Sequence, residues 1–144
     1  MKTLYLVRHA KSSWKYPRLD DFERPLNKRG RKNAPFMGDV LKKRGVMPDM
    51  MLSSPASRAA MTARIIASHI DYLLEDIFYD ESIYVMGAAG MLEVARSMDD
   101  GIDRLMLVGH NPGLTDLANT LGNEPVSNIP TCGIYGIRFK IDAW

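Results

Sequence analysis

The sequence predicts an α/β fold, a single-domain three-layer α/β/α arrangement with a mostly parallel sheet. Three observations predict it: short apolar runs recur along the chain, helical stretches separate them, and Ser-Pro or Asn-Pro pairs follow two of the runs. Strands that alternate with helices form βαβ units, whose crossovers place helices on both faces of a parallel sheet. The 144 residues contain no internal repeat, low-complexity stretch or linker, so we expect one domain over 1–144.

A strand and a long loop open the chain. Residues 2–7 form a short apolar run typical of a buried β-strand. Residues 10–27 contain Pro17 and Pro25 and show little periodicity, so they predict a loop. A loop of this length in a compact domain is usually functional or disordered.

The first predicted helix ends near Arg44, and Gly45 terminates it. Its apolar stripe consists of Phe36, Met37, Val40 and Leu41. Pro35 is poorly placed inside a helix, unless the main helix begins near Asn33, where an asparagine cap and an early proline are both acceptable. We therefore expect this helix to cover about 33–44.

The middle of the chain predicts two further strands. Residues 49–53 form one strand, and the Ser54-Pro55 pair then opens a helix that runs to about residue 70. A weaker strand is expected at 77–79, followed by a loop through Glu81 and Gly87 and a helix over 91–98.

The last third of the chain repeats the strand-then-helix pattern. Residues 104–108 are the clearest buried strand, and Asn111-Pro112 opens a helix to about residue 121. Residues 122–132 are expected to form a loop, and 133–141 alternate as a final strand.

Composition and charge exclude several classes of protein. The formal net charge is only +2, which argues against a general nucleic-acid binder. No run approaches the ~18 apolar residues that a membrane helix needs, and the N-terminal apolar run is too short for a secretory signal. The single cysteine, Cys132, cannot form an internal disulfide and is expected to be a small core residue. We expect a cytoplasmic protein with no nucleic-acid or membrane partner, whereas the oligomeric state is unspecified.

Four basic side chains follow the predicted strands at their carboxyl ends. Arg8 and His9 end the first strand, Arg58 lies in the first turn of the helix after the second, and His110 follows 104–108. Ligands of open α/β sheets bind outside the carboxyl ends of the strands. Each residue alone would usually be a surface or structural residue, but their joint placement predicts a ligand site.

The chemistry of these side chains favours a phosphoryl group. Arginine offers a fixed fork of donors that matches phosphate oxygens, and helix N-termini add N–H groups and partial positive charge. A neutral histidine can act as a nucleophile, and Arg8 should lower the pKa of His9 by like-charge repulsion. Two histidines could instead hold a metal ion, which would need a third imidazole or carboxylate ligand at the same edge. The arginines that crowd the site argue against this, because they would repel a divalent cation. We therefore expect no metal and no cofactor.

Four segments carry a family resemblance: LYLVRHAKSSW, ERPLNKRG, SSPASRAAMTA and VGHNPGL. Their residues and order are similar to the motifs of the histidine phosphatase superfamily, which has the phosphoglycerate-mutase-like fold. Ala10 stands where the superfamily usually has glycine. The short length and the RPL segment resemble the SixA-type phosphohistidine phosphatases in particular, over nearly the whole chain.

The resemblance implies a role for each matched residue. His9 is expected to be the nucleophile that becomes phosphorylated, and Arg8, Arg58 and His110 to hold the phosphoryl group. Arg24 and Asn111 are expected to be further phosphate-binding residues, and the family needs no metal. The general acid stays open between Glu81, after the third strand, and Asp21, in the first loop.

The short connection between residue 70 and the third strand bears on the substrate. Only residues 71–76 lie there, so the helical insertion that covers the pocket of larger relatives is missing and we expect an open, shallow site. This favours a metal-independent phosphatase that hydrolyses phosphohistidine on a partner protein through a phosphohistidine enzyme intermediate. The alternatives are a broader phosphomonoesterase or mutase of the same fold acting on small phosphate esters, and a phosphate-binding module without turnover.

Overall fold

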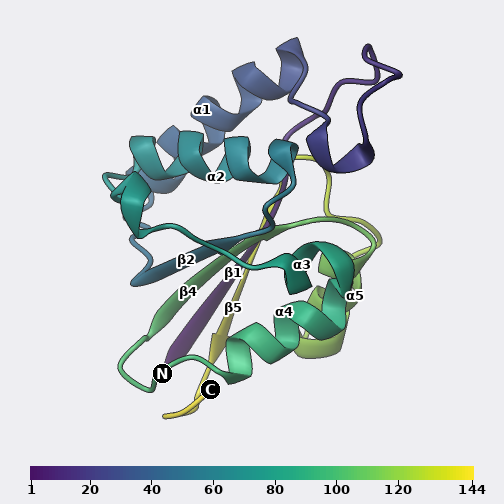
Figure 1. Cartoon of the computed structure of the whole chain (residues 1–144). Coiled ribbons are helices and arrows are strands. Elements are labelled where there is room, and N and C mark those ends of the chain that lie inside the picture. Colours follow the sequence, from purple (N-terminus) through teal and green to yellow (C-terminus); the bar gives the residue numbers. More distant parts are fainter.

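A five-stranded sheet with strand order β3-β2-β4-β1-β5 forms the centre of the computed structural model, which describes residues 1–144 (Figure 1). The strands are β1 (Lys2–Arg8), β2 (Met50–Ser53), β3 (Phe78–Tyr79), β4 (Arg104–Gly109) and β5 (Ile134–Phe139). The first four are mutually parallel, and β5 pairs with β1 in the antiparallel sense at one edge. The predicted mostly parallel sheet is confirmed, with all five expected strands present.

Helices cover both faces of this sheet, as predicted. They are α1 (Lys28–Lys43), α2 (Ser57–His69), α3 (Glu81–Val85), α4 (Gly87–Arg96) and α5 (Gly113–Leu121). Helices α1 and α2 lie on one face, and α3, α4 and α5 lie on the other (Figure 1). Short 3₁₀ turns cover Asp21–Glu23 and Leu74–Asp76. None of the helices is long and apolar enough to cross a membrane.

The central strand β4 supplies both halves of the core. Leu105 and Leu107 pack in the cluster that includes residues of α4 and α5, whereas Met106 and Val108 pack in the cluster that includes residues of α2. All four are 0% exposed. Successive side chains of a strand point to opposite faces, so an unbroken apolar run fits a strand covered on both sides. The rigid centre of the molecule therefore holds the carboxyl ends of β4 and its neighbour β1.

Helix α1 begins five residues before its expected start. The side chain of Asn27 caps it by accepting a hydrogen bond from the Gly30 backbone N–H at 2.9 Å. Gly30 also packs against the Lys11 carbonyl, where a Cβ atom would lie 2.2 Å from the oxygen. These contacts fix the first turns of the helix, and Pro35 is accommodated inside it despite having no N–H to donate.

The buried face of α1 also differs from the predicted stripe. Phe36 is 65% exposed, and of the predicted stripe only Leu41 is buried. The other buried positions are Gly30, Ala34 and Gly38. Small residues at this spacing let α1 approach α2 closely. The helix ends as predicted, because Gly45 adopts a φ of 69° directly after it.

Three other local expectations need correction. The residues after β3 form α3 rather than a loop, because the Asp80 side chain caps the helix by accepting from the Ser82 N–H at 2.9 Å. Helix α2 begins at Ser57, and the Ser54 hydroxyl accepts from the Ala56 N–H at 3.1 Å in the preceding turn. Helix α5 begins at residue 113, and the Asn111 side chain accepts from the N–H of residue 115.

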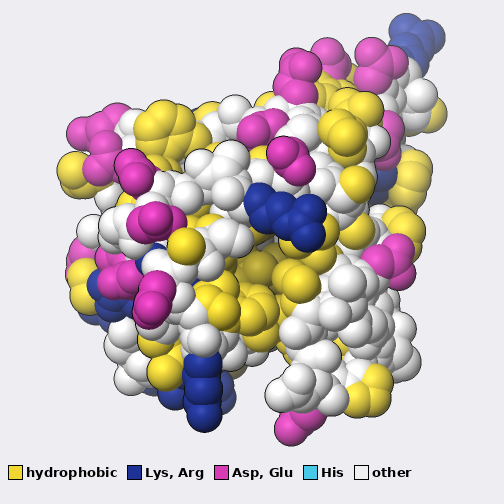
Figure 2. Space-filling model, turned by 90° about the horizontal axis from the view of Figure 1, so that it is seen from below, with side chains coloured by type: hydrophobic (Ala, Val, Ile, Leu, Met, Phe, Trp, Pro, Cys, Tyr) yellow, Lys and Arg dark blue, Asp and Glu magenta, His cyan; other side chains and the backbone are white.

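The two chain termini lie together at one end of the sheet. Figure 2 views the molecule from that end, where hydrophobic side chains gather in the middle and no histidine is visible. Lys2 is buried here, with Nζ donating to the Ile102 carbonyl at 3.0 Å and paired with Asp103 at 3.0 Å. Trp144 donates from Nε1 to the same carbonyl at 2.6 Å. The predicted ligand edge is the opposite end, at the carboxyl ends of the parallel strands.

Candidate active site

A cavity of about 250 Å³ opens at the carboxyl ends of β1 and β4. Its ten lining residues are Arg8, His9, Lys11, Ser12, Trp14, Arg24, Arg58, His110, Asn111 and Thr131. The structure thus brings six sequence-predicted site residues together, from four separate segments. A groove of about 540 Å³ along β5 is larger, but no histidine lines it.

Strand register explains why the two histidines meet. Arg8 at the end of β1 pairs with Gly109 at the end of β4. The next residue on each strand is a histidine, and their ring centroids are 5.2 Å apart. The His9 N–H also donates to the Gly109 carbonyl at 3.1 Å, which prolongs the ladder to the site.

The backbone around His9 is held from two further sides. The His9 carbonyl accepts from the Cys132 N–H at 3.0 Å, and the Ala10 N–H donates to the Thr62 hydroxyl at 2.9 Å. Thr62 in turn donates to the carbonyl of Arg58 at 2.7 Å, one turn earlier on α2. The sequence reasoning missed Thr62, although its place four residues after Arg58 on a helix was a usable signal.

The hydrogen bond of the His9 ring identifies its reactive nitrogen. Nδ1 lies 2.7 Å from the Ala10 carbonyl, which can only accept, so Nδ1 carries the hydrogen. The other nitrogen, Nε2, is then an unprotonated atom with no protein partner. Since the ring lines the cavity and is 8% exposed, this lone pair is available to a bound ligand.

Burial keeps both cavity histidines neutral. It lowers the pKa of His9 to about 4, and repulsion from the nearby guanidinium groups of Arg58 and Arg8 adds to the effect. The expectation that Arg8 repulsion shifts this pKa has the right direction, but burial is the larger cause. Burial, followed by repulsion from His9 and Arg58, lowers the pKa of His110 to about 3.

These shifts predict a pH dependence. In an NMR titration, the ring signals of His9 and His110 should keep the neutral form down to about pH 5. Both groups bind protons more weakly in the native than in the unfolded chain, so stability falls as the pH drops from the unfolded pKa of about 6.5 towards 4. Titration of either ring near pH 6.5 would contradict the neutral site.

Three arginines surround the histidines, and hydrogen bonds to the first loop or to the loop before β5 hold each of them, including Arg58, which donates to the Asp21 carbonyl at 2.6 Å. Arg8 donates from Nη1 to the Ile129 carbonyl at 2.9 Å, while its buried Nε has no partner. Arg24 donates from Nε to the Ser13 carbonyl at 3.1 Å, and the Trp14 ring stacks on its guanidinium at 3.3 Å. These contacts set three guanidinium groups around one small polar cavity, which suits an anion with several oxygens.

His110 and Asn111 complete the wall formed by the end of β4. His110 Nε2 lies 2.7 Å from the Ser54 hydroxyl, and its Nδ1 is buried without a partner. The Asn111 amide donates to the Ile129 carbonyl at 2.9 Å, the same carbonyl that Arg8 uses. Asn111 therefore orders the loop behind Arg8 as well as lining the cavity.

Of the two candidate general acids, Asp21 lies beside the cavity and Glu81 does not. Glu81 is exposed at the start of α3 and does not line the cavity, so the structure does not bring it to His9. Asp21 lies beside the cavity, where hydrogen bonds from Tyr84, Arg58 and Arg24 lower its pKa to about 2 against the opposing effect of desolvation. An anion of this kind has no proton to give near neutral pH.

The connection from which an open site was expected lies away from the cavity. Residues 71–76 connect the C-terminus of α2 to the start of β3, so they lie at the end of the sheet away from the cavity (Figure 1). The element that reaches the site after β3 is α3, and its Tyr84 ring lies 5.4 Å from that of His110. The short connection at 71–76 therefore does not bear on how the cavity is covered, whereas α3 lies next to one of the cavity residues.

Cys132 has the surroundings of a structural residue. Cys132 is buried with a φ of 60°, and burial raises the pKa of its thiol to about 11, which fits a structural residue. No group of three or more His, Cys, Asp or Glu side chains is arranged to hold a metal ion. The cavity has instead the donor set of an anion site.

Comparisons with known proteins agree with this geometry. The model of the histidine phosphatase superfamily (branch 1) matches residues 4–82. A crystal structure from Agrobacterium tumefaciens, assigned to the phosphohistidine phosphatase SixA, is 30% identical with a TM-score of 0.86, covering 94% of this chain and 90% of that one. The protein histidine phosphatase SixA complexed with tungstate has the same fold, with a TM-score of 0.81 at 20% identity, covering 93% of this chain and 86% of that one.

A curated relative extends the match along the sequence. An uncharacterised chloroplastic protein of Arabidopsis thaliana is 30% identical over 151 residues, which cover 99% of this chain and 69% of the relative. The order of the motifs, the fold and the similarity to the Agrobacterium structure lead to one assignment. The chain belongs to the histidine phosphatase superfamily, in branch 1, and is of the SixA type.

Proposed function

We propose that this chain is a metal-independent phosphatase that removes the phosphoryl group from phosphohistidine on a partner protein. Membership of the superfamily supports phosphatase activity. One observation carries the proposal furthest: the unprotonated Nε2 of His9 lines a cavity that holds three guanidinium groups. A cytoplasmic location and a role in signal transduction remain predictions.

The reaction proceeds in two displacements. The Nε2 lone pair of His9 attacks phosphorus, a P–N bond forms to His9, and the P–N bond of the substrate breaks. The released electron pair stays on the leaving imidazole, which takes a proton from solvent. Water then attacks phosphorus and releases a proton to solvent, the P–Nε2 bond breaks with its electron pair returning to His9, and inorganic phosphate leaves. Arg8 and Arg58 balance the charge on the phosphoryl oxygens in both steps, and His110 forms part of the wall that encloses the group.

The choice of phosphohistidine as the substrate follows from the lack of a carboxylic acid that can protonate the leaving group. An alkoxide leaving group needs a proton, and a positioned acid is typically worth ~10²–10⁴-fold in rate. Asp21 is ionised and Glu81 is outside the cavity, so no carboxylic acid is placed to give that proton. An imidazole can leave with less help than an alkoxide, so phosphohistidine is the substrate least affected by the missing acid.

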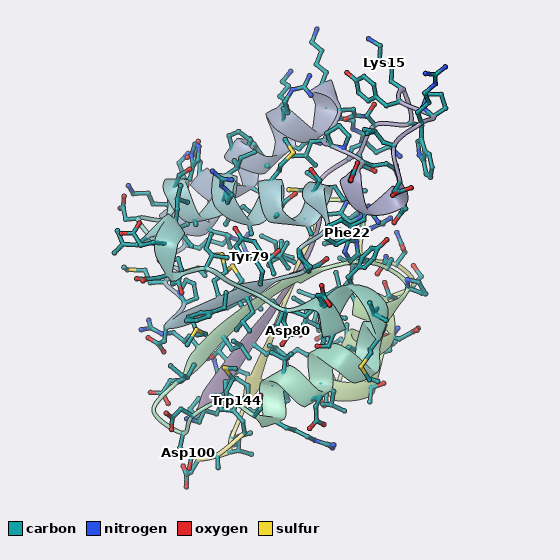
Figure 3. The ribbon with its side chains drawn as sticks, viewed as in Figure 1. Lys15, Phe22, Tyr79, Asp80, Asp100 and Trp144 are labelled. Carbon is teal, nitrogen blue, oxygen red and sulfur yellow. The ribbon has the colours of Figure 1, made fainter.

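The shape of the cavity mouth supports a protein substrate. The loop before α1 forms one side of the mouth, and Trp14 on this loop is 76% exposed. Figure 3 shows this loop projecting from the molecule, with Lys15 near its tip. A phosphorylated side chain on a protein surface could therefore approach the cavity without a lid having to open.

Substrate competition tests the proposal. The value of kcat/KM on phosphohistidine protein should exceed that on phosphoserine protein and on sugar phosphates by about 100-fold or more. Phosphate release from each substrate is measured with and without EDTA, and the chelator should leave all rates unchanged. Faster turnover of sugar phosphates would favour the broader phosphomonoesterase. Loss of activity with EDTA and recovery with Zn²⁺ would contradict a metal-independent reaction.

A further inference from the structure

Asp21 binds two of the cavity arginines at once. Arg58 donates from Nη1 to the Asp21 carbonyl at 2.6 Å and from Nη2 to Oδ2 at 2.9 Å. Arg24 donates from Nη1 to the other carboxylate oxygen, Oδ1, at 2.9 Å. Both guanidinium groups line the cavity, and both side chains are less than 10% exposed. One carboxylate therefore fixes the planes of two phosphate-binding groups.

A third contact fixes the carboxylate itself. The Tyr84 hydroxyl on α3 donates to Asp21 Oδ2 at 2.8 Å. Beside it, the Phe22 and Tyr84 rings pack edge to face with centroids 5.3 Å apart, and Figure 3 shows Phe22 next to α3. The first loop is thus attached to α3 at this point, next to the ring of His110. Because Asp21 bonds to α2 and α3, it connects three segments around the site.

Neither stability nor proton donation explains this arrangement. The Asp21 side chain is 51% exposed, and ion pairs that reach the surface contribute little to folding, typically 0–1 kcal/mol. Its low pKa leaves it ionised throughout the neutral range, so it cannot serve as an acid. An anion at this position also opposes the binding of phosphate, which makes its presence costly unless it orients the arginines.

We infer that Asp21 is a positioning residue, whose carboxylate and backbone carbonyl hold Arg58 and Arg24 in the orientation that receives the phosphoryl group. This inference rests on the proposed function, because it assigns Asp21 to the same phosphoryl-transfer site. A guanidinium that is already oriented loses less entropy when the transition state forms, whereas a free side chain must be ordered at that moment. Asp21 thus acts on catalysis through its two arginines and makes no contact with the reacting atoms.

The test compares Asp21→Asn with Asp20→Asn in the full chain. Asp20 is the adjacent exposed aspartate and its side chain bonds to neither arginine, so Asp20→Asn is the matched control for lost charge. On p-nitrophenyl phosphate, Asp21→Asn should lower kcat/KM by about 10- to 100-fold, mainly through kcat, while Asp20→Asn stays within about 2-fold. Equal thermal unfolding of both variants and the wild type verifies that the fold is intact.

A double-mutant cycle shows whether Asp21 acts through Arg58. Arg58→Lys keeps the charge but cannot form the paired N–H contacts with Asp21. In this background Asp21→Asn should cost less than in the wild-type background, because the orientation of Arg58 is already lost and only that of Arg24 remains. If Asp21→Asn lowers kcat/KM by the same factor in the wild type and in Arg58→Lys, Asp21 does not act through Arg58.

The leaving group separates positioning from proton donation. Asp21→Asn should reduce turnover of phenyl phosphate and p-nitrophenyl phosphate by the same factor, within about 3-fold. A much larger loss on phenyl phosphate, whose leaving group is the poorer one, would make Asp21 an acid. If the wild type is active and Asp21→Asn is equally active, the positioning role of Asp21 is wrong but the proposed function stands. A wild type that transfers phosphate from no substrate removes the proposed function and this inference with it.

Discussion

Replacement of His9 by alanine should abolish phosphatase activity, with kcat/KM on phosphohistidine protein reduced on the order of 10⁵-fold or more. The variant lacks the Nε2 lone pair that attacks phosphorus, and His110 cannot replace it because its Nε2 is bonded to Ser54. Alanine removes only the side chain, and the backbone contacts that hold residue 9 stay in place.

Transfer of label from phosphohistidine protein measures this effect directly. In rapid-quench samples the wild type should carry label on His9, and His9→Ala should neither acquire label nor release phosphate. His69→Ala is the matched control, because His69 lies at the far end of α2 and bonds to Asp39 instead of a cavity residue. Retained activity in His9→Ala, or label on another residue, would refute the two-displacement mechanism.

Replacement of Arg8 by alanine should lower kcat by about 10²- to 10³-fold, the loss expected for one oxyanion donor. The buried Nε of Arg8 has no partner in the protein, and a buried donor left unpaired is costly. A phosphoryl oxygen would satisfy it, most strongly when negative charge develops in the transition state. Arg8→Lys should recover only part of the rate, because an ammonium group cannot present this donor in the same plane.

Steady-state rates on phosphohistidine protein for Arg8→Ala, Arg8→Lys and Arg138→Ala provide the measurement. Arg138 is an exposed arginine of β5. Arg138→Ala removes the same charge far from the phosphoryl site, so the kcat and KM of this variant should match those of the wild type. An Arg8→Ala variant with unchanged kcat and KM would show that the unpaired Nε is not a phosphoryl contact.

Much of the fold and of the site followed from short-range features of the sequence. The apolar run of β4 and the residues after it, His110 and Asn111, predicted a buried strand that delivers polar side chains to one edge. Parallel pairing made the rest of the site predictable, because strands that run in one direction end at the same edge. Arg8, His9 and Arg58 could therefore be grouped without any coordinates.

Long-range contacts set the limits of that reasoning. The early start of α1 depends on Gly30 packing against the carbonyl of Lys11, a contact that local propensity does not encode. The importance of Asp21 arises only when the first loop folds back onto α2 and α3, since its partners are 37 and 63 residues away. Glu81 was one of two candidate acids because it follows a strand, but it is exposed at the start of α3, and Tyr84 is the residue of that helix that bonds to Asp21.

The antiparallel course of β5 has a practical consequence for handling the protein. Lys2 pairs with Phe139, so the chain enters and leaves at one pole, and the reacting pole is the other (Figure 1). A linker attached at residue 1 or 144 can therefore tether the molecule to a bead, a sensor surface or a scaffold with its catalytic pole facing the solution. The indole of Trp144 must be kept, because its hydrogen bond to the Ile102 carbonyl holds the last residues against the fold.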